Sequence, residues 1–242
     1  MDLSVVVPVF NEEENIQPLV DEIRAALEGQ CDYELIYVDD GSTDATPERL
    51  RAAMAGLPRL RVLRHARSCG QSTAIRTGIK AARAPWVATL DGDGQNDPAD
   101  IPRLLARVQA PDCPPDLRLV AGWRQRRQDN WLRRLSSRLA NGVRSRLLRD
   151  GTPDTGCGLK IIHRETFLDL PYFDHMHRFL PALVQRTGAR VESVVVHHRP
   201  RERGQSKYGV GNRLWVGIVD LFGVRWLQRR ARVPEVDELE RA

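Results

Sequence analysis

The chain opens with an almost unbroken run of apolar, mostly β-branched residues at positions 3–10. Such a run predicts a strand that is buried on both faces. Further strand patterns lie at 33–38, 60–63, 86–90, 117–121, 159–162 and 191–196. Helical spacing of apolar residues follows at 16–27, after an acidic first turn at 12–14, then beyond Asp44, which is expected to cap the second helix, and again at 71–82 and 98–108. Strands that alternate with helices predict an α/β fold, a Rossmann-like and mostly parallel sheet flanked by helices.

Polar and acidic residues follow three of these strands: 11–12, 39–40 and 91–93. Ligands of open parallel sheets bind outside the carboxyl ends of the strands, so we expect the three clusters to form one site. Asp91 and Asp93, one residue apart, suit Mg²⁺ or Mn²⁺, a cation that can neutralise charge on a departing diphosphate. The pattern favours an enzyme acting on a diphosphate-containing substrate, although solvated turn carboxylates remain the alternative.

The second half is more basic. Residues 123–149 contain nine arginines and one aspartate, with apolar residues at helical spacing, which predicts a helix at about 130–148. Because a solvated helix face normally mixes both signs, we interpret this one as facing an anion. Residues 214–226 are apolar and too short to span a bilayer. They suit either a helix lying in the membrane interface or an ordinary amphipathic helix packed on the domain.

Composition fits one large globular domain: 242 residues, 41% apolar and 29% charged. We expect a nucleotide-binding half at about 1–122, an acceptor half at about 123–228 and a disordered tail at 229–242. The net charge of +5 implies an anionic partner. Four scattered cysteines, with no C-x-x-C pair, indicate reduced thiols in a cytosolic protein. We expect neither a signal peptide nor a transmembrane segment.

Several motifs together resemble family 2 glycosyltransferases of the GT-A fold. They are VVVPVFNE at 5–12, VDDGSTD at 38–44 and LDGDGQ at 90–95. DTG at 154–156 and RERGQSKY at 201–208 narrow the resemblance to the dolichol-phosphate mannosyltransferase branch, which loads a sugar onto a polyprenyl phosphate. The resemblance covers about residues 3–228, and its R-x-x-G-x-S-K element is far more specific than the D-x-D.

The resemblance implies site residues, each at a matching motif position. The nucleotide sugar, a GDP- or UDP-hexose, would contact Pro8, Phe10, Glu12, Val38, Asp40, Asp91, Gly92, Asp93 and Arg124. Among these, Glu12 and Asp40 would hold the base or ribose. The metal ligands would be Asp91, Asp93 and Gln95. The acceptor phosphate would contact Arg124, Arg133 and Ser137, and Arg201 and Lys207 would close over the donor phosphates.

Two residues depart from the family pattern: Phe10 replaces a more frequent tyrosine, and Trp123 a small residue before Arg124. A phosphate acceptor is already anionic and needs positioning more than a general base, a task that suits arginine. We therefore expect direct displacement with inversion at the anomeric carbon. Asp154, the one candidate carboxylate of the later half, more readily holds its turn. Without a transmembrane helix, the protein would work at the cytoplasmic membrane face through its basic helices or a separate membrane protein.

Three rival functions remain. The same fold could transfer sugar to a saccharide or protein hydroxyl, which would call for a well-placed base. A nucleic-acid-binding module would explain the arginines but not the acidic strand ends, so nucleic acid is not expected as a partner. A catalytically idle scaffold would not need the D-x-D and R-x-x-G-x-S-K elements.

Overall fold

The computed structural model describes residues 1–125, 142, 144–200 and 211–234. Their centre is a seven-stranded sheet in the order β3-β2-β1-β4-β6-β5-β7. The strands are β1 Leu3–Val9, β2 Tyr33–Asp39, β3 Leu60–Arg64, β4 Trp86–Thr89, β5 Leu117–Trp123, β6 Lys160–His163 and β7 Arg190–Val195. Only β6 runs antiparallel to its neighbours, β4 and β5, among these strands. The predicted α/β fold with a mostly parallel sheet is confirmed.

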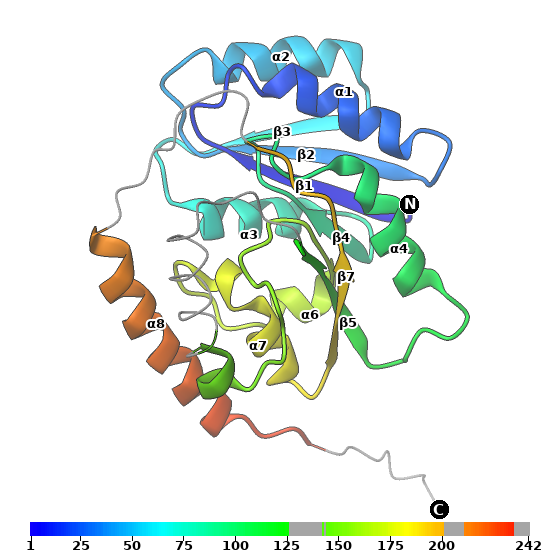
Figure 1. The fold of residues 1–242 in the computed structure, drawn as a ribbon. Helices are drawn as coiled ribbons and strands as arrows, with labels where there is room; N and C mark the ends of the chain where they lie inside the picture. Colours follow the sequence, from blue (N-terminus) through cyan, green and yellow to red (C-terminus); the bar gives the residue numbers. More distant parts are fainter. Residues whose placement is uncertain (126–141, 143, 201–210, 235–242) are drawn as a thin grey trace, which may run out of the picture.

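Helices cover both faces of the sheet (Figure 1). The described helices are α1 Ile16–Leu27, α2 Thr46–Gly56, α3 Gln71–Ala81, the 3₁₀ turn η1 Pro98–Asp100, α4 Ile101–Gln109, α6 Arg164–Leu168, the 3₁₀ turn η2 Met176–Arg178, α7 Leu180–Gln185 and α8 Gly211–Arg230. One apolar core joins α1, α2 and α4 to one face of the sheet. A second core joins α3, α6, α7 and α8 to the other face. The result is a three-layer α/β arrangement.

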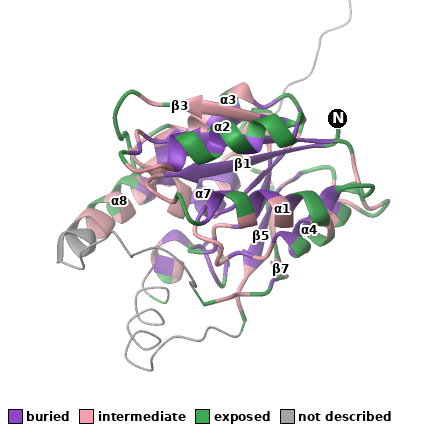
Figure 2. Cartoon of the chain, turned by 90° about the horizontal axis from the view of Figure 1, so that it is seen from above, coloured by how far each residue is buried: buried purple, intermediate pink, exposed green. Residues whose placement is uncertain are grey.

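Burial follows the pattern that the sequence predicts. All residues of β1 and β2 are buried, whereas α1 buries one side and exposes the other (Figure 2). On the opposite face α3 lies close to β1, because Gly78 has no side chain: a Cβ there would lie 3.2 Å from Val38 Cγ2 and would press on Val6. The N-terminus of α3 lies at the carboxyl edge of the sheet because α3 follows β3, which runs parallel to β2.

The first helix differs from its prediction. Helix α1 begins only at Ile16, and no acidic residue lies in its first turn. Residues 12–14 belong to the preceding turn, where the amide of Asn11 donates to Ser42 Oγ and that of Glu12 to Thr46 Oγ1. The N-cap of α2 is Ala45, one residue after the predicted Asp44, and it makes no side-chain cap hydrogen bond; Asp44 Oδ1 accepts from the amide of Thr46, the first residue of the helix.

The second half holds further differences. The sequence analysis missed α6, η2 and α7, which are all short. Of the helix predicted at 130–148, the structure describes only residues 142 and 144–148, and these are helical. The predicted strand at 117–121 extends to Trp123.

Helix α8 has two contrasting sides. Val224 is buried against the second core, with Leu221 and Leu227 partly buried beside it. Val219, Phe222 and Trp226 on its other side are 68%, 62% and 58% exposed. The helix thus packs on the domain, as the second interpretation expects, and it also presents an apolar stripe. Within the described residues, no helix has the length and apolar character that crossing a bilayer requires.

Candidate active site

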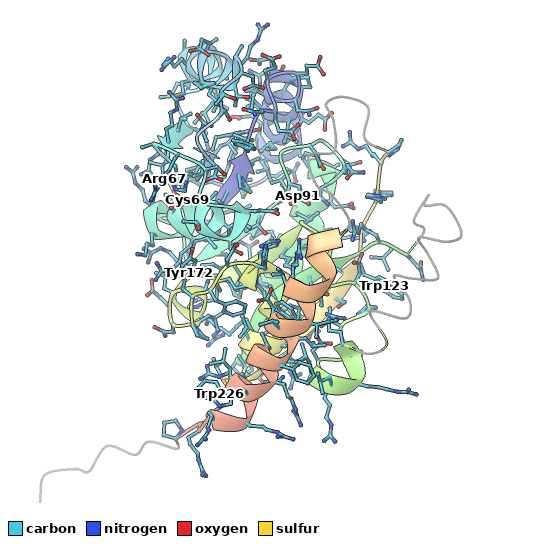
Figure 3. The ribbon with its side chains drawn as sticks, turned by 90° about the vertical axis from the view of Figure 1, so that its left-hand side faces the viewer. Arg67, Cys69, Asp91, Trp123, Tyr172 and Trp226 are labelled. Carbon is cyan, nitrogen blue, oxygen red and sulfur yellow. The ribbon has the colours of Figure 1, made fainter. Side chains whose placement is uncertain are left out.

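Three polar strand ends meet at one edge of the sheet. Because β1 lies between β2 and β4, and all three run parallel, the residues that follow them are neighbours. Figure 3 looks onto this edge and labels Asp91. The expected convergence of the clusters at 11–12, 39–40 and 91–93 is therefore confirmed by the topology.

Asp91 is held by three other segments of the chain. Its Oδ1 accepts a hydrogen bond from Gln71 Nε2 at 2.7 Å, and its amide donates to Asn96 Oδ1 at 3.1 Å. On another side its carboxylate lies against Gly158, where an added Cβ would be 2.5 Å from Asp91 Cγ. Burial, and then the nearby charge of Asp93, raises the pKa of Asp91 above its usual value. A cation bound beside Asp91 would stabilise the charged carboxylate against both effects.

The other two candidate metal ligands, Asp93 and Gln95, lie in the turn that follows Asp91. Asp93 Oδ1 accepts from the amide of Gln95 at 3.1 Å, and Gly94 has a φ of 72°, which favours glycine. Gly92 packs tightly under β1, since a Cβ there would lie 2.9 Å from Pro8 O. Carboxylate and amide oxygens gathered on one turn are ligands that suit a hard divalent cation.

Asp40, expected to hold base or ribose, is the centre of a hydrogen-bond cluster. Its carboxylate accepts from His65 Nδ1 at 2.6 Å, Ser68 Oγ at 2.7 Å, and the amides of Cys69 and Gly70, both at 2.9 Å. Burial raises the pKa of Asp40, but these four hydrogen bonds together outweigh it, so the pKa lies below its usual value. Asp40 therefore fixes the loop at 65–70 beside this edge of the sheet.

The other expected donor contacts differ in burial. Pro8 and Val38 are paired in register within β1 and β2, and Val38 is fully buried in the core under α3. Phe10 is partly exposed just beyond β1. Glu12 Oε2 accepts from Asn15 Nδ2 at 2.7 Å in the turn before α1. Phe10 and Glu12 thus lie at the open edge, whereas the side chain of Val38 lies in the core.

Arg124 and Asp154 form a buried ion pair. Arg124 Nε and Nη2 donate to the two carboxylate oxygens of Asp154 at 2.7 and 2.9 Å, and their side chains are 11% and 6% exposed. Burial lowers the pKa of Arg124. The hydrogen bond and the charge of Asp154 raise it by more, so the pKa lies above its usual value. The expected turn-holding role of Asp154 thus includes neutralising Arg124, the arginine assigned to the phosphates.

A buried lysine lies beside this pair. Lys160 is 4% exposed, and its ammonium donates to Cys157 O. Burial lowers the pKa of Lys160, while the charges of Asp91 and Asp154 oppose that effect. The charges of Lys160 and Arg124 both act to lower the pKa of Asp91, against the larger effect of burial.

The chain segment that leads into the R-x-x-G-x-S-K element lies beside the turn that carries the candidate metal ligands. The amide of Arg199 donates to Gln95 O at 3.1 Å, and Asn96 forms an antiparallel bridge with His198. The guanidinium of Arg199 pairs with Asp97 at 2.7 Å and with Glu22. The motif thus starts beside the D-x-D turn. Arg201, Lys207, Arg133 and Ser137 themselves lie outside the described residues.

Some residues of this edge were not predicted: Gln71, Asn96, Gly158 and Lys160. Gln71 lies 20 residues before its partner Asp91, and Gly158 lies 67 residues after it. Contacts across such separations leave no local periodicity or spacing. The one available signal was the position of Gln71 at the start of a predicted helix, next to a glycine.

The sequence matches one described family. A profile with the description "Glycosyl transferase family 2" matches residues 4–170. A dodecaprenyl-phosphate galacturonate synthase of Rhizobium johnstonii is 40% identical over 235 residues, 95% of this chain and 68% of the relative. An undecaprenyl-phosphate 4-deoxy-4-formamido-L-arabinose transferase of Edwardsiella ictaluri is 38% identical over 211 residues, 86% of this chain and 63% of the relative. The chain thus spans about two thirds of the length of these relatives.

Solved structures share the fold. Glucosyl-3-phosphoglycerate synthase from Mycobacterium tuberculosis, in complex with Mn²⁺, UDP-Glc and glycerol 3-phosphate, has a TM-score of 0.68 at 20% identity, covering 97% of this chain and 81% of that one. A mannosyltransferase from Pyrobaculum calidifontis, in complex with GDP-Man and Mn²⁺, has a TM-score of 0.65 at 19% identity, covering 96% and 65%. At these identities the likeness concerns the fold, which is GT-A.

Proposed function

This chain belongs to glycosyl transferase family 2, and we propose that it transfers a sugar from a nucleotide sugar to a polyprenyl phosphate, with inversion at the anomeric carbon. The observation that carries the proposal is the meeting of Glu12, Asp40 and Asp91 at one edge of the sheet, beside the segment that enters the R-x-x-G-x-S-K element. The names of the two relatives described above support a polyprenyl-phosphate acceptor.

Asp91, Asp93 and Gln95 would hold a divalent cation, Mg²⁺ or Mn²⁺. Their oxygens fit such an ion, and Mn²⁺ appears in the names of both structural neighbours. When bound, the cation supplies charge neutralisation for the leaving diphosphate. Asp40 keeps the 65–70 loop in place around the donor.

The acceptor needs positioning rather than deprotonation, since a phosphate monoester is anionic at neutral pH. The bidentate bond between Arg124 and Asp154 supports this reading, because Asp154 is engaged as the counter-ion of an arginine. Arg133 and Ser137 remain proposed for the acceptor phosphate, and Arg201 and Lys207 for the donor phosphates.

We further propose that the protein works as a peripheral protein on the cytoplasmic face of the membrane, with the exposed stripe of α8 against the lipid. Val219, Phe222 and Trp226 lie three and four residues apart, so they line one side of the helix. Arg229, Arg230 and Arg232 follow and are exposed. An apolar stripe with basic residues at its end fits an anionic bilayer surface, which would also hold the lipid acceptor. Cosedimentation with vesicles measures this binding. Cosedimentation with native membranes tests whether a separate membrane protein takes part.

A transfer assay tests the activity. The protein is incubated with radiolabelled UDP-galacturonate, UDP-glucose or GDP-mannose, undecaprenyl phosphate and Mn²⁺, and the label in the organic phase is counted. We expect label in a lipid product with one of these donors, dependent on the cation, and at least about a hundredfold less with Asp93→Asn. Label that moves only to saccharide or protein acceptors would favour the rival hydroxyl transfer and overturn the proposal.

A further inference from the structure

Asp91 accepts a hydrogen bond from an uncharged donor, and the charges of Lys160 and Arg124 also act on it. Gln71 Nε2 lies 2.7 Å from Asp91 Oδ1, and Gly158 occupies another side of the same carboxylate. The hydrogen bond from the side-chain amide of Gln71 and the contact with Gly158 together restrict the rotation of the Asp91 side chain. One carboxylate oxygen, Oδ1, is thus oriented by Gln71, which adds no charge of its own.

Gln71 is itself held on both sides. It is the first residue of α3, and the amides of the two preceding residues, Cys69 and Gly70, donate to Asp40. The next residue, Ser72, makes a 2.7 Å hydrogen bond through its Oγ to His177 Nδ1. Gly70 has a φ of 88°, a conformation that favours glycine, and this sets the turn into α3. The side chain of Gln71 therefore starts from a backbone that cannot shift freely.

The chemistry of an amide suits this place. A lysine or arginine at position 71 would neutralise Asp91 and compete with a bound cation. An amide N–H orients the carboxylate through a hydrogen bond and adds no net charge. Outer partners that orient metal-binding carboxylates typically contribute about 10- to 100-fold in metal affinity or activity.

We infer that Gln71 is a positioning residue that fixes Asp91 for binding of the divalent cation and ties it to the Asp40-anchored loop at 65–70. The inference rests on the proposed function, because it takes Asp91 as a metal ligand. It assigns Gln71 no contact with the reacting atoms. It links two parts of the site that the sequence motifs leave separate, namely the nucleotide side at Asp40 and the metal side at Asp91.

The test compares Gln71→Met with the wild-type protein. Methionine keeps the length of the side chain and removes the N–H donor, and Gln71→Ala serves as a second variant should methionine disturb the fold. The matched control is Gln17→Met, since Gln17 Nε2 makes a similar 3.1 Å bond to Asp21 on the exposed side of α1. Mn²⁺ binding is measured by electron paramagnetic resonance of the free ion, with and without UDP, alongside the melting temperature of each protein.

We expect Gln71→Met to weaken Mn²⁺ binding about tenfold while Gln17→Met leaves it unchanged. Transfer activity should recover in part at high Mn²⁺, since the ligand itself is still present. Wild-type affinity for Mn²⁺ in both Gln71 variants, when folded, would overturn the inference and leave the proposed function standing. No Mn²⁺ binding by the wild-type protein, with or without UDP, would overturn both.

Discussion

Gly158 has no side chain, and the carboxylate of Asp91 occupies the space where one would lie. A methyl group there would come within 2.5 Å of Asp91 Cγ and 2.7 Å of Asn96 Oδ1. Gly158→Ala should therefore move Asp91 away from its position while the protein stays folded. Because a displacement of about 1 Å can cost about a hundredfold in rate, we expect transfer activity to fall by about that factor.

A second glycine provides the control for this change. Gly56, at the end of α2, has no neighbour within 4 Å of the position of an added Cβ. Gly56→Ala should leave activity unchanged and stability equal or slightly higher, since alanine is favoured in helices by about 1 kcal/mol. Activity assays and thermal melts of the two variants measure both effects. Near-normal activity in a folded Gly158→Ala protein would show that Asp91 tolerates displacement.

For single residues, the sequence predicted which acidic side chains follow the strands but not which side chains would bind to them. Asp91 follows an apolar run directly and Asp40 lies two residues after one, so local pattern and sheet topology were enough to bring them to one edge. The bonds from Gln71 to Asp91 and from Arg124 to Asp154 join segments 20 and 30 residues apart. These pairs depend on how α3 and β5 pack, which no spacing along the chain reports.

Among the elements, α8 carries the prediction about the membrane. Replacing Phe222 and Trp226 together by serine removes two rings that are largely exposed, so the fold should keep its melting temperature. Binding to vesicles containing anionic lipid should fall at least about tenfold, because each ring loses burial in the interface. Cosedimentation with vesicles, at low and high salt, measures the loss.

The control for α8 is an exposed apolar residue elsewhere. Met54 is 41% exposed and lies on α2, which covers the other face of the sheet from α8. Met54→Ser should bind vesicles like the wild-type protein. Equal binding by the Phe222 and Trp226 double variant would place the lipid-facing surface elsewhere.

The elements that the sequence missed share a physical reason. Helices α6 and α7 contain five and six residues, too few to complete the periodic pattern by which a helix is identified. The apolar stretch of α8 was identified, but not the turns that extend it to 20 residues, because its ends have mixed composition. Its two sides became distinct only in the packed structure, where Val224 is buried and Phe222 is not.

For the whole molecule, the alternation of strands and helices was sufficient to predict the layers, whereas strand direction was not fully predictable. The four residues of β6, Lys-Ile-Ile-His, form a strand pattern that fits either direction. Their antiparallel course depends on where the preceding chain enters the sheet between β4 and β5. That antiparallel strand brings Lys160 under the acidic edge and Gly158 against Asp91.

Stability of the whole fold should depend on two buried carboxylates. Glu34 accepts hydrogen bonds from Ser4 Oγ, Arg61 and the amide of Arg83, which together outweigh burial and lower the pKa of Glu34, as four bonds do for Asp40. A carboxylate with a lowered pKa stabilises the folded state above its unfolded pKa and loses that contribution as pH falls through its folded pKa. The free energy of unfolding in urea should therefore hold from neutral pH to about 5 and decline below about pH 4, near the unfolded values of these groups.

Glu34→Gln isolates one of these contributions. At pH 7 the variant should lose about 2 kcal/mol, because buried donors lose a charged acceptor, and the difference from wild type should shrink as the pH approaches 3. Glu48→Gln is the control, since Glu48 pairs with Arg51 on the exposed side of α2 with a side chain that is 64% exposed, and should change stability by less than about 0.5 kcal/mol at every pH. Urea titrations of the three proteins between pH 3 and 7 give these differences. A constant difference between Glu34→Gln and wild type across that range would mean that the charge of Glu34 does not contribute, and that the loss comes from replacing an acceptor oxygen by an amide donor.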